Sequence, residues 1–159
     1  MSKIKLLAVH HSASPRATTF KQIREWHLAR GWRDIGYHRG IRQASDGHQV
    51  QVQDLRPHDG DADLDTWEYG AHVKGSNAHS LGVVLVGNYS TEPVPPAMWS
   101  ALIECLAGWC YVYGLDPYDA VSGHNEAATN PTECPGRQVD MVLLRFQVYK
   151  RLDAIHAHR

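Results

Sequence analysis

Residues 80–89, with the sequence SLGVVLVGNY, form the most apolar short run in the chain and indicate its fold class. The run is too short to cross a bilayer, which takes about 20 residues in a helix. A short apolar run bounded by turn residues is typical of a strand that is buried on both faces. We therefore predict that residues 80–86 are the central strand of a sheet with helices on both sides.

A second buried strand is predicted at residues 4–10, where Lys5 alone interrupts an apolar run. The pair His10 and His11 stands at the end of this strand. Side chains alternate along a strand, so only one of the two imidazoles can point into a site there. The pattern itself does not choose between them.

A helix is predicted after this strand. Thr19 and Gln22 form a capping box at its start, and Gly31 is expected to stop it after Arg30. The residues expected on its apolar face are Phe20, Ile23 and either Trp26 or His27.

The middle of the chain is more polar. Residues 36–42 and 49–53 are expected to pair as a hairpin, because the turn signature Ser45-Asp46-Gly47 separates them. Residues 55–68 are acidic and indicate a solvated surface. Calcium binding is the alternative for the aspartates between Asp59 and Asp65, but the EF-hand spacing is missing.

Two longer helices are predicted in the second half. The first starts at Pro95-Pro96 and ends at Tyr113, since apolar residues recur there every three or four positions. A short strand at residues 120–123 then leads to His124. The last helix is predicted at residues 139–155, with an apolar face of Val139, Val142 or Leu143, Phe146, Tyr149 and Leu152.

Composition limits the class of protein. A chain of 159 residues with 43% apolar content predicts one domain with a single core over residues 1–159. With the strands and helices expected above, we predict an α/β domain with a central mixed β-sheet flanked by helices. A formal net charge of −1 means that the chain has no excess of basic residues, which disfavours binding to nucleic acid or to an anionic membrane. Cys105, Cys110 and Cys134 are an odd number and argue against a disulfide framework. The N-terminal residues lack the features of a signal peptide, so we expect synthesis in the cytoplasm.

The segment 123–136, GHNEAATNPTECPG, carries the clearest candidate chemistry. An imidazole from His124 and a thiolate from Cys134 are both suited to zinc. Their spacing is not that of a self-contained zinc finger, so a third ligand must come from elsewhere, and the histidine pair at residues 10 and 11 is the obvious source. Three protein ligands would leave a fourth position for water, as in catalytic zinc sites.

Several separated motifs occur in an order that resembles a known family. They are AVHHSAS, IREWHLARGWRDIGYH, GAHVKGSNAHSLGVVLVGNY, GHNE and TECPG. Together they resemble the type 2 N-acetylmuramoyl-L-alanine amidases, which include phage lysozyme-type endolysins and peptidoglycan recognition proteins. The resemblance spans residues 9–136. The sequence departs from the family pattern at Ser76, where an aromatic residue is expected, and in a segment between His124 and Cys134 that is about two residues longer.

The resemblance implies roles for seven residues. It implies one zinc ion per chain, in a groove at one edge of the sheet, with His10, His124 and Cys134 as ligands. It also implies that Tyr37 and Thr132 take part in catalysis and that His72 and Asn77 line the groove for the peptide stem. On this reading Tyr37 donates to the oxyanion and Thr132 positions the water or the carbonyl.

The implied activity is zinc-dependent hydrolysis of the amide bond between N-acetylmuramic acid and L-alanine in peptidoglycan. The segments resemble the compact phage enzymes of the family more closely, which favours a phage or prophage endolysin that reaches the wall through holin-type membrane lesions. We expect a monomer. The alternatives are a non-catalytic peptidoglycan-binding module, a cytoplasmic cell-wall recycling amidase, a regulatory partner with the same fold and a metal-dependent nuclease. The near-neutral charge disfavours the nuclease.

Overall fold

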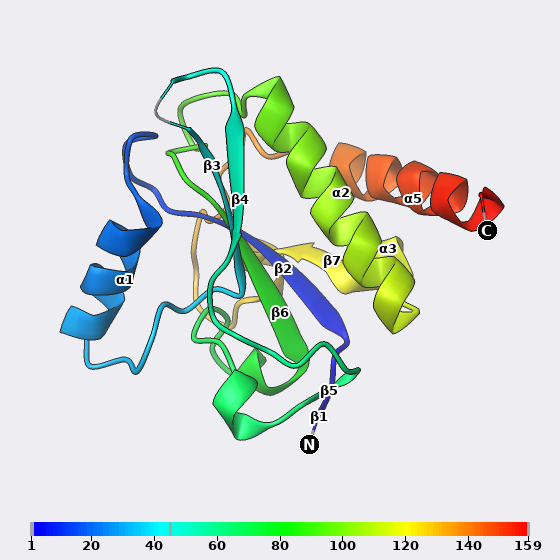
Figure 1. Cartoon of the computed structure of the whole chain (residues 1–159), viewed down its shortest axis with the longest axis horizontal. Helices are drawn as coiled ribbons and strands as arrows, with labels where there is room; N and C mark the ends of the chain where they lie inside the picture. The colour runs from blue at the N-terminus through cyan, green and yellow to red at the C-terminus, as the bar shows by residue number, and fades with distance from the viewer. Residues whose placement is uncertain (1, 45, 159) are drawn as a thin grey trace.

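A five-stranded mixed sheet forms the centre of the molecule (Figure 1). The computed structural model describes residues 2–44 and 46–158. The strands, in spatial order, are β4 (Val50–Asp54), β3 (Arg39–Gln43), β6 (Ser80–Leu85), β2 (Leu6–His11) and β7 (Val121–Gly123). β4 is antiparallel to β3, and the other neighbours are parallel. The predicted central strand is confirmed as β6.

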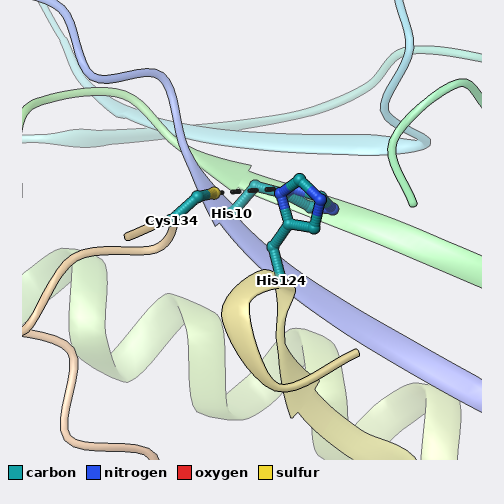
Figure 2. Close-up of side chains that lie close together, drawn as sticks. All are labelled: His10, His124 and Cys134. Atoms are coloured by element: carbon teal, nitrogen blue, oxygen red, sulfur yellow. Dashed lines mark hydrogen bonds between the residues drawn. The ribbon is translucent and has the colours of Figure 1, made fainter. Parts of the chain in front are cut away.

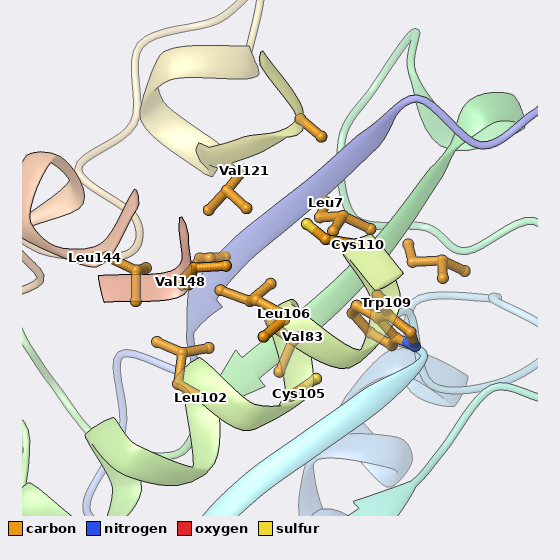
Figure 3. Packing of buried hydrophobic residues seen from close by; sticks show 14 of the residues in the cluster. Leu7, Val83, Leu102, Cys105, Leu106, Trp109, Cys110, Val121, Leu144 and Val148 are labelled. Carbon is orange, nitrogen blue, oxygen red and sulfur yellow. The ribbon is translucent and has the colours of Figure 1, made fainter. Parts of the chain in front are cut away.

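One face of the sheet packs against the two long helices, α2 (Pro96–Tyr113) and α5 (Met141–Ala157). Figure 3 shows Leu7 of β2 and Val83 of β6 among the side chains of these helices. The predicted start of α2 is confirmed, and Gly114 follows its last residue in the left-handed conformation, with φ 65°. Within residues 2–44 and 46–158, no helix is both long and apolar enough to cross a bilayer.

On the opposite face of the sheet, aromatic side chains lie directly against the backbone of two strand glycines. Gly40, Val84 and His10 are paired in register across β3, β6 and β2 and therefore share this face. The ring of Phe20, the first residue of α1 (Phe20–Ala29), lies where a Cβ of Gly40 would stand. A second glycine, Gly82, is covered in the same way by the ring of His72.

The capping box at the start of α1 is confirmed, with Thr19 and Gln22 bonded to each other's backbone. His27 is buried and Trp26 is 47% exposed, which settles the alternative left by the sequence. The hairpin of β3 and β4 is also confirmed. Ser45 of its predicted turn lies outside the described residues, while Asp46 accepts hydrogen bonds from the backbone N–H groups of residues 48 and 49.

The predicted apolar face of the last helix was largely wrong. Val142 is 76% exposed, and Leu143, Phe146 and Tyr149 are exposed as well. The face that packs on the core consists of Leu144, Val148 and Leu152. Apolar residues occur on several sides of α5, so periodicity does not select a face, and contact with α2 and the sheet does.

Shorter elements complete the described chain. They are β1 (Ser2–Lys3) paired with β5 (Asp63–Leu64), the 3-10 helices η1 (Thr66–Glu68) and η2 (Asn77–His79), and the short helices α3 (Pro117–Ala120) and α4 (His124–Ala127). In the acidic segment, the buried Glu68 accepts hydrogen bonds from the backbone N–H groups of Asp59 and Asp65. The carboxylates of Asp59, Asp65 and Glu68 lie close together there.

Candidate metal centre

His10 and His124 meet because two neighbouring strands are parallel. Val9 of β2 is in register with Gly123 of β7, so the next residue on each strand lies at the same edge of the sheet. The carboxyl ends of parallel strands are a common place for binding sites. The two imidazole rings lie with their centroids 4.6 Å apart. The cluster thus stands at one edge of the sheet, as the sequence predicted.

Cys134 reaches the same place from a loop that is held at two points close to the cysteine. The backbone N–H of Asn125 donates to the carbonyl of Cys134 at 2.7 Å, which joins this loop to the start of α4. Gly136, with φ 97°, lies so close to the backbone of Tyr89 and Ser90 that a Cβ would collide with it. The thiol therefore has a fixed position beside the two histidines.

The geometry of the three side chains fits a zinc ion. One ligand atom from each of His10, His124 and Cys134 lies within 4.8 Å of the others. The Nδ1 atom of His10 is 3.6 Å from the Sγ atom of Cys134 (Figure 2). Zn–N and Zn–S bonds of about 2.05 and 2.3 Å at a tetrahedral angle put the nitrogen and the sulfur about 3.6 Å apart. The cluster thus already has one edge of a zinc tetrahedron.

The protonation states suit coordination. Burial, and then the neighbouring rings of His72 and His124, hold the pKa of His10 well below its usual value, so its imidazole is neutral. Burial also lowers the pKa of His124. Burial raises the pKa of the Cys134 thiol to about 12. The backbone N–H of His11, which donates to Sγ at 3.4 Å, lowers this pKa but has the smaller effect. A bound cation reverses that preference, because a coordinating thiol is deprotonated.

His11 points away from the cluster. It is in register with Leu85 of β6 on the face that packs against α2, opposite the face of His10. Its Nδ1 atom accepts a hydrogen bond from the backbone N–H of Tyr89 at 3.0 Å. Of the histidine pair, only His10 brings its ring to the cluster.

Tyr37 and Thr132 line the same cavity as the cluster, which has a volume of about 620 Å³. The Tyr37 ring lies 5.0 Å from that of His10, and burial, followed by the charge of Cys134, raises its pKa above the ordinary value. The phenol therefore keeps its proton and is a hydrogen-bond donor. The hydroxyl of Thr132 accepts from the backbone N–H of Cys134 at 3.2 Å, which leaves its proton for another acceptor.

His72 and Asn77 line an adjoining cavity of about 530 Å³, which shares His72, His124 and Thr132 with the first. The side-chain oxygen of Asn77 accepts from the backbone N–H groups of His72 and Val73 and so shapes the loop. The positions of His72 and Asn77 in the wall of this cavity agree with the expected groove. Contact of either residue with a substrate stays a prediction.

Some residues at the site were given no role in the sequence analysis. Trp32 lines both cavities, but it follows a helix end and belongs to no periodic pattern. Ser80 contacts His72 and was read only as the first residue of a strand. Glu126, two residues after His124, accepts hydrogen bonds from Arg145 through both carboxylate oxygens at 2.9 Å.

Comparison with known proteins agrees with this arrangement. The sequence model of N-acetylmuramoyl-L-alanine amidases matches residues 1–137. The endolysin of Klebsiella phage KP32 is 37% identical over 130 residues, which cover 79% of this chain and 76% of that protein. Peptidoglycan-recognition protein LB of Drosophila melanogaster is 30% identical over 137 residues, 80% of this chain and 53% of that protein. This chain thus spans about half the length of that recognition protein.

A solved structure shares the fold. N-acetylmuramoyl-L-alanine amidase LysC from Clostridium intestinale URNW superposes with a TM-score of 0.76 at 25% sequence identity, covering 92% of this chain and 86% of that one. The family match includes every strand of the central sheet and all three residues of the cluster. The chain therefore belongs to the N-acetylmuramoyl-L-alanine amidase family.

Proposed function

We propose that this protein is a zinc-dependent N-acetylmuramoyl-L-alanine amidase that hydrolyses the bond between N-acetylmuramic acid and L-alanine in peptidoglycan. The observation that carries the proposal is the cluster of His10, His124 and Cys134 at the wall of a cavity, with ligand atoms within 4.8 Å of one another and one nitrogen–sulfur distance that fits a tetrahedral zinc ion. Two imidazoles and one thiolate leave a fourth position, which is the pattern of a catalytic rather than a structural zinc site.

The residues around the cluster support hydrolysis. Zinc, when bound, supplies Lewis-acid polarisation and a water of lowered pKa. The Tyr37 phenol, protonated and beside His10, donates a hydrogen bond to the oxyanion that develops on the amide carbonyl. The Thr132 hydroxyl, held by the backbone N–H of Cys134, positions the attacking water or the carbonyl.

We assign the adjoining cavity to the peptide stem. It opens beside His124 and is lined by His72 and Asn77. Similarity to phage endolysins supports a phage or prophage endolysin. As part of the proposal, residues 1–159 form one domain that acts as a monomer on the cell wall after holin-type release. Peptidoglycan is the partner in this proposal, and neither nucleic acid nor a membrane is.

The test is amide cleavage by the zinc-loaded protein on purified peptidoglycan. We expect release of peptide stems with new L-alanine amino termini, and muramic acid left with a free lactyl carboxylate. The matched control is Cys134→Ala, which should neither retain zinc nor release stems. Stem binding without new amino termini in the zinc-loaded wild type would contradict the proposal and favour a non-catalytic binding module.

A cytoplasmic recycling amidase is the second candidate, because the chemistry of the site is the same for both. The substrate separates the two functions. An endolysin cleaves intact, cross-linked peptidoglycan, whereas a recycling enzyme acts on soluble muropeptides. The rates at which the protein cleaves equal amounts of the two substrates, measured in parallel, therefore distinguish the two functions.

A further inference from the structure

We propose that His72 and Ser80 are positioning residues that fix the tautomer of His10, so that the Nδ1 atom of His10 always offers its lone pair to the metal. The inference rests on the zinc site of the proposed function, but the tautomer itself exists without zinc. Nothing in the sequence pointed to Ser80, and the role given to His72 differs from a direct contact with the peptide stem.

Three consecutive hydrogen bonds lead away from the metal cluster. The Nε2 atom of His10 lies 2.9 Å from the Nδ1 atom of His72. The other ring nitrogen of His72, Nε2, lies 3.1 Å from the hydroxyl oxygen of Ser80. That hydroxyl lies 2.8 Å from the backbone carbonyl of Ser76. Both ring nitrogens of His72 are therefore engaged within the protein.

The end of this chain sets its direction. A carbonyl oxygen can only accept, so the Ser80 hydroxyl donates its proton to the carbonyl of Ser76. The Ser80 oxygen must then accept from the Nε2–H of His72, which leaves the Nδ1 atom of a neutral His72 without a proton. That atom accepts from the Nε2–H of His10. The Nδ1 atom of His10 is thereby unprotonated.

Both rings are neutral, as this assignment requires. His10 is 1% exposed and His72 is 7% exposed. Charging either ring would bury a cation against other histidine rings, which is unfavourable in the absence of a charged partner. The unprotonated Nδ1 atom of His10 is the atom that lies 3.6 Å from the Sγ atom of Cys134. The hydrogen bonds thus present a lone pair at the metal position.

The fold holds the His72 ring in place. Its atoms lie against Gly82, where a Cβ would come within 2.6 Å of Nδ1, and the ring makes an edge contact with His38 at 5.6 Å between centroids. Asn77 holds the backbone of His72 from the other side. Ser80 is fully buried at the start of β6. The relay, by which we mean the hydrogen bonds from His10 through His72 and Ser80 to Ser76, therefore joins the strands β2 and β6 to a loop that Asn77 holds in shape.

Without the relay, a neutral His10 has a choice of tautomer. A proton on Nδ1 would have to leave before a metal could bind there, and this reduces the apparent affinity. Partners of metal-bound histidines commonly contribute about 10- to 100-fold in metal affinity. We expect the same range for the His72 acceptor.

The tautomers can be observed directly in the zinc-free protein. Nitrogen-15 labelling of histidine, followed by two-bond nitrogen–proton correlation spectra at pH 7, distinguishes Nε2–H from Nδ1–H rings. Spectra of variants in which one histidine at a time is replaced assign each signal to its residue. We expect Nε2–H tautomers for both His10 and His72. A His10 ring protonated at Nδ1 would overturn the proposal, whatever the activity of the enzyme.

Two isosteric variants isolate the acceptor. His72→Asn keeps an oxygen near the position of Nδ1, whereas His72→Leu has nearly the same shape and no acceptor. Competition with a chelator should give a zinc dissociation constant about 10- to 100-fold weaker for His72→Leu and close to wild type for His72→Asn. Circular dichroism checks that both variants fold.

The two variants also separate this inference from the proposed function. Equal zinc affinity in His72→Asn and His72→Leu would show that the ring only fills space, and it would overturn the relay. Ser80→Ala gives a second measure, because it deletes the acceptor for the Nε2–H of His72. Its spectrum should show the Nδ1–H tautomer of His72 appearing, and an unchanged spectrum would contradict the direction of the chain. Expected tautomers in a wild type that does not cleave peptidoglycan would refute the amidase function alone.

Discussion

Tyr37 allows metal binding and catalysis to be separated. Its ring lies beside that of His10, but Tyr37 is not one of the three residues that we propose as zinc ligands. We expect Tyr37→Phe to fold and to bind zinc as the wild type does, while turnover falls about 100- to 1000-fold, or about 2.7 to 4 kcal/mol, as when one oxyanion donor is removed. Zinc analysis and stem release from peptidoglycan check the two halves. Undiminished release would mean that another group stabilises the oxyanion.

The neighbouring histidines of β2 give opposite predictions. His10→Ala should abolish zinc binding, whereas His11→Ala should leave zinc in place, because the His11 ring points to the other face. His11→Ala instead leaves the N–H of Tyr89 without its acceptor, and an unsatisfied buried group costs about 1 to 3 kcal/mol. Metal content and urea denaturation measure the two effects. Loss of zinc only in His11→Ala would reverse the assignment.

At the level of residues, motifs predicted more of the site than local patterns did. The histidine, cysteine, tyrosine and threonine positions follow from the resemblance to the family, and the structure brings these side chains to one cavity. Which of His10 and His11 points inward depends on the register of Val9 with Gly123, a contact between distant parts of the chain. Ser80 carries no signal, since its role exists only once His72 lies over Gly82.

The elements show the same division between local and distant causes. The start of α1 was predictable because Thr19 and Gln22 satisfy backbone groups within one turn, and Pro96 and Gly114 mark the ends of α2 in the same way. The buried face of α5 was not predictable from its sequence. Its apolar residues surround the helix, and only packing against α2 and the sheet decides which of them are buried.

The face of α5 can be tested with one substitution at two positions. Val148 is fully buried and Val142 is 76% exposed on the same helix. Val148→Ala removes two buried methyl groups and leaves a cavity, so it should cost about 1.5 to 3 kcal/mol of unfolding free energy. Val142→Ala should be neutral or slightly stabilising, because alanine favours a helix. Urea denaturation measures both, and a larger loss at Val142 would restore the face expected from the sequence.

Across the molecule, buried histidines link stability to pH. His27 and His38 are both buried, and burial is the main cause that lowers the pKa of each from 6.5 to about 4. Between these values the unfolded chain binds more protons than the native one, so stability is full above pH 6.5 and is lost as the pH falls towards 4. Each of the two should cost about 2 kcal/mol by pH 5. His10 and His72 act in the same direction, since burial lowers their pKa values as well.

His27 offers a control for this pH dependence, because its Nδ1 atom only accepts a hydrogen bond, from the backbone N–H of Gly36 at 2.9 Å. His27→Asn can keep an acceptor at that position and cannot take up a proton. Urea denaturation of the zinc-free protein at pH 7, 6 and 5 should show a loss of stability that is about 2 kcal/mol smaller in the variant than in the wild type. Identical losses in the two proteins would mean that His27 has the same pKa in the folded and unfolded states. In that case the loss of stability in acid would come from the other buried histidines alone.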